Sequence, residues 1–215
     1  MNLSKRLFAV ATLVDVNSRV IDVGCDHAYL DIYLTLNNGN TCIATDINSN
    51  ALAIAKNNIK VKNLEGKIET ILTDGLKNIG VKAEDNIVMS GMGTHTILHI
   101  LSTNKLSNTL IISSNNDIEL LRIEVVKLGY IIDSEIFLID KNKSYIIIKF
   151  VKGFKKYSKN DLKYGPILKN NKLYISYLIE NDNHVIKKIS KKKFILRLKY
   201  KLHVFFLKMR LNKKA

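Results

Sequence analysis

Apolar residues in positions 1–151 alternate between short continuous runs and a helical spacing. Short runs bounded by polar residues or glycine predict buried strands, and a three-to-four-residue spacing predicts helices. The predicted strands are Arg19–Gly24, Thr41–Asp46, Lys67–Leu72, Asn86–Ser90, Thr109–Ser113, Tyr130–Leu138 and Ser144–Val151. The predicted helices between them are Tyr29–Leu36, Ser49–Ile59, Thr94–Leu101 and Asp117–Leu128.

This alternation predicts an α/β fold in which helices cover both faces of a parallel sheet through right-handed crossovers. The last two strands are joined by Ile139–Lys143, a polar stretch suited to a hairpin, so the last strand should run antiparallel to the rest. A doubly wound sheet with an antiparallel last strand resembles the Rossmann-like architecture of class I methyltransferases. Many enzymes share such sheets, so the pattern alone leaves the function open.

Residues 152–215 have a different character. A basic connector over 152–165 contains Gly153 and leads to Gly165 and the only proline, Pro166. Two helices are predicted, over about 167–189 and 192–211, from the spacing of Leu173, Tyr177, Leu178, Val185 and Ile189, and of Phe194, Leu198, Leu202, Phe205 and Met209. Two antiparallel, coiled-coil-like helices are the simplest arrangement. Because the turn near 190–193 has no Gly or Pro, one long continuous helix is the alternative. We therefore expect two domains, 1–151 and 152–215.

The positive charge is confined to the second of these segments. Residues 1–150 hold 15 Lys and Arg against 16 Asp and Glu, whereas residues 151–215 hold 19 against 3, within a total net charge of +15. A general bias towards lysine would act on both segments equally. The segregation instead indicates an acidic partner of the last third, with nucleic acid or an anionic membrane as the leading candidates.

Composition and motif content exclude several classes. No apolar run is long enough to cross a bilayer, and the N-terminal residues lack the apolar stretch and cleavage site of a signal peptide. Two cysteines, Cys25 and Cys42, are too few for a disulfide framework or a zinc site, and we expect them to be small buried residues, with a reactive Cys25 as the minor alternative. We expect a cytoplasmic, monomeric protein without a metal ion.

Acidic residues follow three successive predicted strands. Asp22, Gly24 and Asp26 belong to the first strand and its loop, Asp46 ends the second, and Asp74-Gly75 follows the third. In open parallel sheets ligands bind beyond the carboxyl ends of the strands. Since G-x-G-x-x-G is absent, a nicotinamide or flavin site is disfavoured. A sulfonium cofactor carries an ammonium group and ribose hydroxyls that carboxylates can bind. Each aspartate alone also fits a turn or a helix cap.

Two further loops follow the fourth and fifth strands. Met92 lies between two glycines in Gly91–Gly93, where its thioether suits the face of a flipped base, although a core position fits the spacing equally well. Asn115 follows the fifth strand and carries an amide that suits a base edge; a helix start is the alternative.

Five segments resemble the bacterial tRNA (adenine-22, N1) methyltransferase family: Leu3–Leu7, Asp22–Leu30, Asp74–Leu76, Gly91–Gly93 and Tyr164–Leu168. The sequence differs from the usual residues of that family at Cys25, Thr94 and 113–114. The resemblance implies S-adenosylmethionine as the methyl donor, tRNA as the substrate and N1 of an adenine in the D-loop region as the methylated atom.

The chemistry of that reaction selects candidate catalytic residues. Adenine N1 has a lone pair, so alignment is the main task, and a carboxylate would stabilise the cationic product. We assign this role to Asp26, which could instead hold the cofactor's ammonium group, with Tyr29 as a stacking or hydrogen-bonding partner. His27 is placed with the cofactor site, although a histidine at a helix start is more often structural.

Basic residues are the candidates for binding RNA. Lys5 and Arg6 would contact phosphate at the rim of the pocket. The densest basic cluster consists of Lys187, Lys188, Lys191, Lys192, Lys193 and Arg197. Two alternatives remain: a non-catalytic RNA-binding protein with a methyltransferase-like fold, and a methyltransferase that acts on another substrate.

Overall fold

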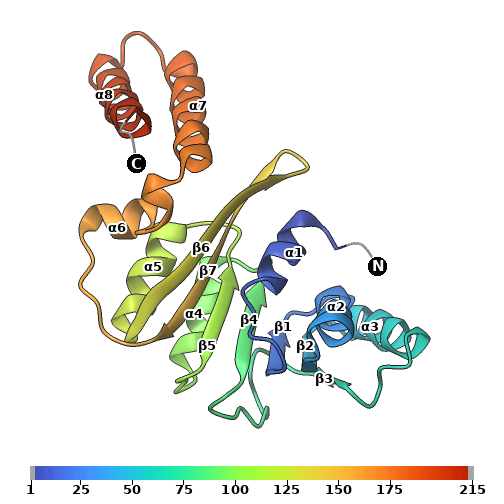
Figure 1. Ribbon diagram of the computed structural model, residues 1–215. Coiled ribbons are helices and arrows are strands. Elements are labelled where there is room, and N and C mark those ends of the chain that lie inside the picture. The colour runs from blue at the N-terminus through green and yellow to red at the C-terminus, as the bar shows by residue number, and fades with distance from the viewer. Residues whose placement is uncertain (1–2, 213–215) are drawn as a thin grey trace. The chain divides into compact units, whose positions relative to one another are not determined.

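Seven strands form one mixed sheet in the computed structural model, which describes residues 3–212 (Figure 1). The strands are β1 (Arg19–Val23), β2 (Thr41–Asp46), β3 (Ile68–Leu72), β4 (Asn86–Ser90), β5 (Thr109–Ser113), β6 (Tyr130–Asp140) and β7 (Lys143–Lys152). Their spatial order is β3-β2-β1-β4-β5-β7-β6. Strands β1 to β5 are parallel, and β7 runs antiparallel to both β5 and β6. The predicted doubly wound sheet with an antiparallel last strand is confirmed.

Helices cover both faces of this sheet. They are α1 (Lys5–Ala11), α2 (Tyr29–Asn38), α3 (Ser49–Val61), α4 (Thr94–Ser102) and α5 (Ile118–Lys127). Apolar residues of α1, α2 and α3 share one buried cluster with Val20, Val88 and Ile111 of the sheet. Helices α4 and α5 contact each other and lie on the opposite face (Figure 1). Because both faces are covered, the inner strands β1, β4 and β5 are each buried at four of their five residues.

The strand order determines where the site lies. Strand β1 is flanked by β2 on one side and β4 on the other, so the direction of winding reverses beside β1. The loops that follow β1 and β4 therefore run to opposite faces of the sheet and leave a crevice between them at the carboxyl ends of the strands.

The chain divides into two compact units, Met1–Lys156 and Tyr157–Ala215. The second unit contains α6 (Lys159–Tyr164), a 3₁₀ turn η1 (Leu168–Asn170), α7 (Lys172–Lys188) and α8 (Phe194–Leu211). The turn between α7 and α8 separates two helices, so the single continuous helix left open by the sequence is not formed. Asn171 caps α7 by accepting a hydrogen bond from the Tyr174 N–H.

The packed face of the α7–α8 pair differs from the predicted apolar spacing. The buried contact is made by Ile175 and Ile179 of α7 with Val204 and Leu207 of α8. The five α8 residues that recur at helical spacing in the sequence, Phe194, Leu198, Leu202, Phe205 and Met209, are all exposed. Helix α8 is apolar on more than one side, so spacing alone selected the wrong face.

Candidate functional site

A cavity of about 510 Å³ opens at the carboxyl ends of the parallel strands in the first unit. It is lined by Arg6, Val23, Gly24, Asp26, Thr45, Asp46, Ile47, Thr73, Asp74, Gly75, Ser90, Gly91, Met92, Thr96 and Ile100. Seven of these residues are sequence-predicted site residues, and they come from α1, from the end of β2 and from the loops after β1, β3 and β4. The cavity therefore brings together seven of the twelve predicted site residues of the first unit.

The loop after β1 has an unusual backbone. Gly24 has φ +79°, and a Cβ placed there would lie 3.8 Å from the Met92 sulfur. Asp26 and Ala28 also have positive φ values, of 53° and 55°, which non-glycine residues rarely adopt. The Gly24 and Cys25 N–H groups both donate to the Thr45 carbonyl at 2.8 Å. Strained residues of this kind persist where the surrounding structure holds them, and they concentrate at functional sites.

Asp46 connects the loops after β1 and β2. Its Oδ2 accepts a hydrogen bond from the Asp26 N–H at 3.0 Å, and its Oδ1 accepts one from the Asn48 N–H at 2.8 Å. The carboxylate is half-buried at the wall of the cavity. It is thereby held in place, with lone pairs left for a ligand.

Asp74 and Gly75 form another part of the wall. Asp74 Oδ2 accepts a hydrogen bond from Lys77 Nζ at 2.6 Å, and this contact lowers the pKa of the exposed Asp74 carboxyl. Gly75 has φ +66°, and a Cβ there would lie 3.1 Å from Ile100 Cγ1. The glycine therefore permits both the turn and the close approach of α4.

Asp22 lies beneath the cavity and is not among the residues that line it. It is buried, as is Asp31 of α2, whose exposed fraction is 0%. Burial and the neighbouring charge of Asp31 raise the pKa of Asp22. Burial also raises the pKa of Asp31 to about 7. The sequence prediction did not include Asp31, because an aspartate in the first turn of a helix usually serves the helix itself.

Arg6 carries positive charge from α1 into the same cavity. Its Nη1 donates a hydrogen bond to the Ser90 hydroxyl at the end of β4. Its guanidinium carbon lies 5.8 Å from the centre of the Tyr145 ring. The charge of Arg6 opposes the effect of burial on the pKa of Asp22. No role was predicted for Ser90, because the spacing of residues in the sequence does not indicate its hydrogen-bond partner Arg6, 84 positions away.

The Gly91–Gly93 loop is held by Asn115. The Asn115 N–H donates to the Met92 carbonyl at 2.9 Å, and its side-chain amide donates to the Gly91 carbonyl at 2.6 Å. Asn115 does not line the cavity, so it positions the loop that does. Beside it, the Thr94 hydroxyl lies 2.8 Å from the Ser114 hydroxyl. Two positions that differ from the usual family residues are thus in contact.

The remaining predicted residues of the first unit lie outside the cavity wall. Tyr29 is exposed, and its ring makes an edge contact with the His27 ring at 5.8 Å. His27 Nδ1 lies 3.4 Å from Asp26 Oδ1. Lys5 is exposed on α1. Cys25 is buried, and burial raises the pKa of its thiol, which keeps the sulfur protonated and disfavours a reactive role.

The predicted basic cluster gathers at the α7–α8 turn. Lys187 and Lys188 end α7, the three lysines 191–193 occupy the turn, and Arg197 lies in the first turns of α8. Lys191 and Arg197 line a depression of about 280 Å³ together with Phe194, Leu198 and Lys201. The turn is thus strongly cationic.

Two kinds of feature, a helix that could span a membrane and a cluster of metal-binding side chains, are absent from residues 3–212. In this part of the chain no helix is long and apolar enough to cross a membrane. No group of three or more His, Cys, Asp or Glu side chains is placed there to hold a metal ion.

The fold and the cavity are those of a Rossmann-like methyltransferase domain. A family model described as "Methyltransferase domain" matches residues 3–148. The structure of TrmK from M. capricolum, in complex with the cofactor product S-adenosyl-homocysteine, has a TM-score of 0.80 and 33% identity over 98% of each chain. Streptococcus pneumoniae Sp1610, a putative tRNA (m1A22) methyltransferase solved with S-adenosyl-L-methionine, has a TM-score of 0.83 and 26% identity, covering 98% of this chain and 100% of that one.

A curated relative gives the same family. The tRNA (adenine(22)-N(1))-methyltransferase of Bacillus subtilis is 32% identical over 153 residues, or 69% of this chain. The match spans 64% of that protein, less than two thirds of its length. These similarities show that the chain belongs to the tRNA (adenine(22)-N(1))-methyltransferase family.

Proposed function

We propose that this protein transfers a methyl group from S-adenosylmethionine to N1 of an adenine in tRNA, at position 22. The observation that carries the proposal is the cavity at the switch point of the sheet, in a chain of this family. It brings together carboxylates from the end of β2 and from the loops after β1 and β3. We further propose that it acts in the cytoplasm as a monomer.

The cavity fits the proposed cofactor chemically. S-adenosylmethionine, when bound, supplies an electrophilic methyl group on a positively charged sulfur. Its ammonium group and ribose hydroxyls need hydrogen-bond acceptors, and Asp26, Asp46 and Asp74 supply carboxylates around the wall. Gly24 and Gly75 leave room where a Cβ would narrow the cavity or strain the turn. We assign Asp46 to the ribose, because its carboxylate is fixed by two backbone N–H groups.

The chain's catalytic contribution is mainly alignment. Adenine N1 attacks through its own lone pair, so no prior deprotonation is required. Met92 lines the cavity with its side chain close to Gly24, where its thioether can pack against the face of the adenine ring. Asn115 holds the backbone of the Met92 loop in place.

Asp26 is the candidate for stabilising the cationic methylated base. Its side chain lines the cavity and is 73% exposed, so it can reach a bound ligand. A carboxylate at this place offsets the positive charge that develops on adenine. Tyr29, next to His27, is assigned to stacking at the rim.

The second unit supplies affinity for tRNA. It carries Lys187, Lys188, Lys191, Lys192, Lys193 and Arg197 around one turn. Contacts from these side chains to phosphate release counterions and so favour binding strongly at low salt. That free energy offsets the cost of taking the target adenine out of its stack, which is about a few kcal/mol. In the first unit, Lys5 is exposed on α1 and Arg6 lines the cavity, and these two side chains add phosphate contacts there.

Incubation of the protein with unmodified tRNA and isotopically labelled S-adenosylmethionine tests the proposal. We expect labelled 1-methyladenosine after digestion to nucleosides, and its loss when adenine 22 is replaced by guanine. Cofactor binding without methylation of any tRNA would overturn the assigned substrate. Absence of both cofactor binding and methylation would favour a non-catalytic RNA-binding protein.

A further inference from the structure

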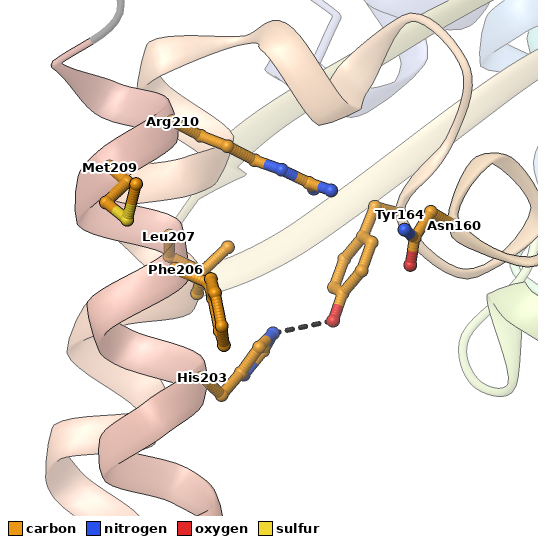
Figure 2. A pocket seen from close by; sticks show the side chains of 7 residues that line it. All are labelled: Asn160, Tyr164, His203, Phe206, Leu207, Met209 and Arg210. Carbon is orange, nitrogen blue, oxygen red and sulfur yellow. Dashed lines mark hydrogen bonds between the residues drawn. The ribbon is translucent and has the colours of Figure 1, made fainter.

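A hydrogen-bonded cluster ties together the three helices of the second unit. The Tyr164 hydroxyl of α6 lies 2.6 Å from His203 Nε2 of α8 (Figure 2). On the other side of the same ring, His203 Nδ1 lies 2.5 Å from Asp182 Oδ2 of α7. The two ring nitrogens of His203 thus have different partners, the Asp182 carboxylate at Nδ1 and the Tyr164 hydroxyl at Nε2. The cluster therefore fixes one wall of the space between α6 and α8.

A cavity of about 360 Å³ adjoins this cluster. Figure 2 shows its lining, which consists of Asn160, Tyr164, His203, Phe206, Leu207, Met209 and Arg210. The methyl-transfer site uses none of these residues. The lining combines aromatic rings, a thioether, an amide and a guanidinium group.

The rings have different surroundings. Tyr164 is buried; the His203 ring stacks on it at 5.6 Å, and the Arg210 guanidinium lies 5.4 Å from its centre. Phe206 is 59% exposed, and Met209 beside it is also exposed. Tyr164 is thus part of the scaffold, whereas Phe206 and Met209 offer free apolar surface to a ligand.

The charge of this unit indicates an anionic ligand. Residues 157–215 contain 16 Lys and Arg against 3 Asp and Glu. Two of the three acids are already paired, Asp161 with Lys169 and Asp182 with His203. Within residues 3–212, no carboxylate lies in ion-pair range of Arg210.

We propose that this cavity binds one unpaired nucleotide of the RNA, with its base stacked on Phe206 and Met209 and its phosphate on Arg210. The Asn160 amide faces the same space and can bond to a base edge. Proteins read RNA largely through unstacked bases packed on aromatic and Arg planes. A phosphate would give the Arg210 guanidinium the anionic partner that it lacks among residues 3–212. This inference rests on the proposed tRNA substrate, to which it adds a second contact remote in sequence from the methyl-transfer site.

Equilibrium binding of full-length tRNA transcript to Phe206→Ala tests the stacking contact. We expect affinity to fall roughly 5- to 150-fold, the loss typical of one base–aromatic stack. Phe205→Ala is the matched control, since Phe205 is 58% exposed on the same helix and does not line the cavity. It should bind tRNA nearly as the wild type does.

Arg210→Gln tests the phosphate contact independently. The slope of log affinity against log salt should become shallower by about 0.7, the change for one single-stranded phosphate. In addition, tRNA containing 4-thiouridine should cross-link under long-wavelength light to the peptide that spans residues 203–210. Both variants leave the α7–α8 core intact, because Ile175, Ile179, Val204 and Leu207 are untouched; thermal melting checks this.

The outcomes separate this inference from the proposed function. If the wild type binds and methylates tRNA while Phe206→Ala and Arg210→Gln bind it unchanged, the nucleotide pocket is wrong and the methyltransferase assignment stands. Equal losses in Phe206→Ala and Phe205→Ala would also overturn the pocket, because the effect would then not be specific to the cavity. If the wild type does not bind tRNA at low salt, both proposals fail.

Discussion

Two aspartates near the loop after β1 illustrate how surroundings decide a residue's role. The Asp26 side chain is 73% exposed and lines the cavity, whereas Asp31 is fully buried beside Asp22. Water and bound ligand can reach the first carboxylate, and burial favours the protonated form of the second. Asp26 is therefore suited to stabilise charge on a substrate, and Asp31 to respond to pH.

Replacing Asp26 with Asn should lower the turnover of tRNA methylation by about 10²- to 10⁴-fold, because the carboxylate that we propose to face the cationic product is lost. tRNA affinity should remain close to wild type, since most phosphate contacts lie elsewhere. Single-turnover kinetics and binding titrations measure the two effects. Asp133→Asn, at an exposed position on β6, is the control. Near-normal turnover would remove Asp26 from the mechanism.

The pKa of Asp31, raised to about 7, predicts a pH-dependent stability. A carboxyl group with a raised pKa binds its proton more tightly in the folded than in the unfolded protein. Its stabilising contribution is therefore present below about pH 4 and is lost as the pH rises towards 7 and above. Asp31→Asn should make the melting temperature less dependent on pH between 5 and 8. Parallel pH profiles of variant and wild type would contradict this.

At the scale of elements, a buried ion pair joins α5 to β6. Arg122 Nε donates to Glu135 Oε1 at 2.8 Å, and both side chains are almost completely buried. Neither charge can be solvated if its partner is removed. This pair fixes the helix against the edge strand of the sheet.

Glu135→Gln should therefore reduce the free energy of unfolding by about 3 to 5 kcal/mol, because the buried guanidinium loses the negative charge of Glu135. Urea denaturation measures the loss. The double variant Arg122→Met, Glu135→Leu should lose much less, since apolar side chains replace both charges. A double variant as unstable as the single one would argue that packing, not charge, dominates.

Strong periodicity made most elements predictable from sequence, and short or ambiguous segments were missed. The strands β2, β4 and β5 have the predicted bounds, because continuous apolar runs end at polar residues. Helices α1 and α6 have only 7 and 6 residues, too few to establish a period. The burial of Asp31 and the contact of Arg6 with Ser90 depend on residues far apart in sequence, so spacing could not reveal them.

At the scale of the whole molecule, chemistry and charge are divided between two units. The cavity lies in Met1–Lys156, whose strands and helices form their own core, while the basic helices lie in Tyr157–Ala215. Affinity for a methyl donor and affinity for polyphosphate should therefore respond differently to salt. Only the second depends strongly on counterion release.

A chain that ends at Lys156 should bind S-adenosylmethionine as the full chain does but lose methylation of full-length tRNA by at least about tenfold, because it lacks most phosphate contacts. Calorimetry and labelled-methyl transfer give the two readouts, and circular dichroism checks that the truncated chain is folded. Efficient methylation by the shortened protein would show that the basic helices are dispensable.

Both native sulfhydryl groups, Cys25 and Cys42, are buried, and burial raises the pKa of each. Thiolates are the species that maleimides attack, so the folded protein should resist alkylation. Both groups lie in the first unit, beside β1 and in β2. The rate at which they become labelled would therefore report how often the sheet opens, without any engineered probe.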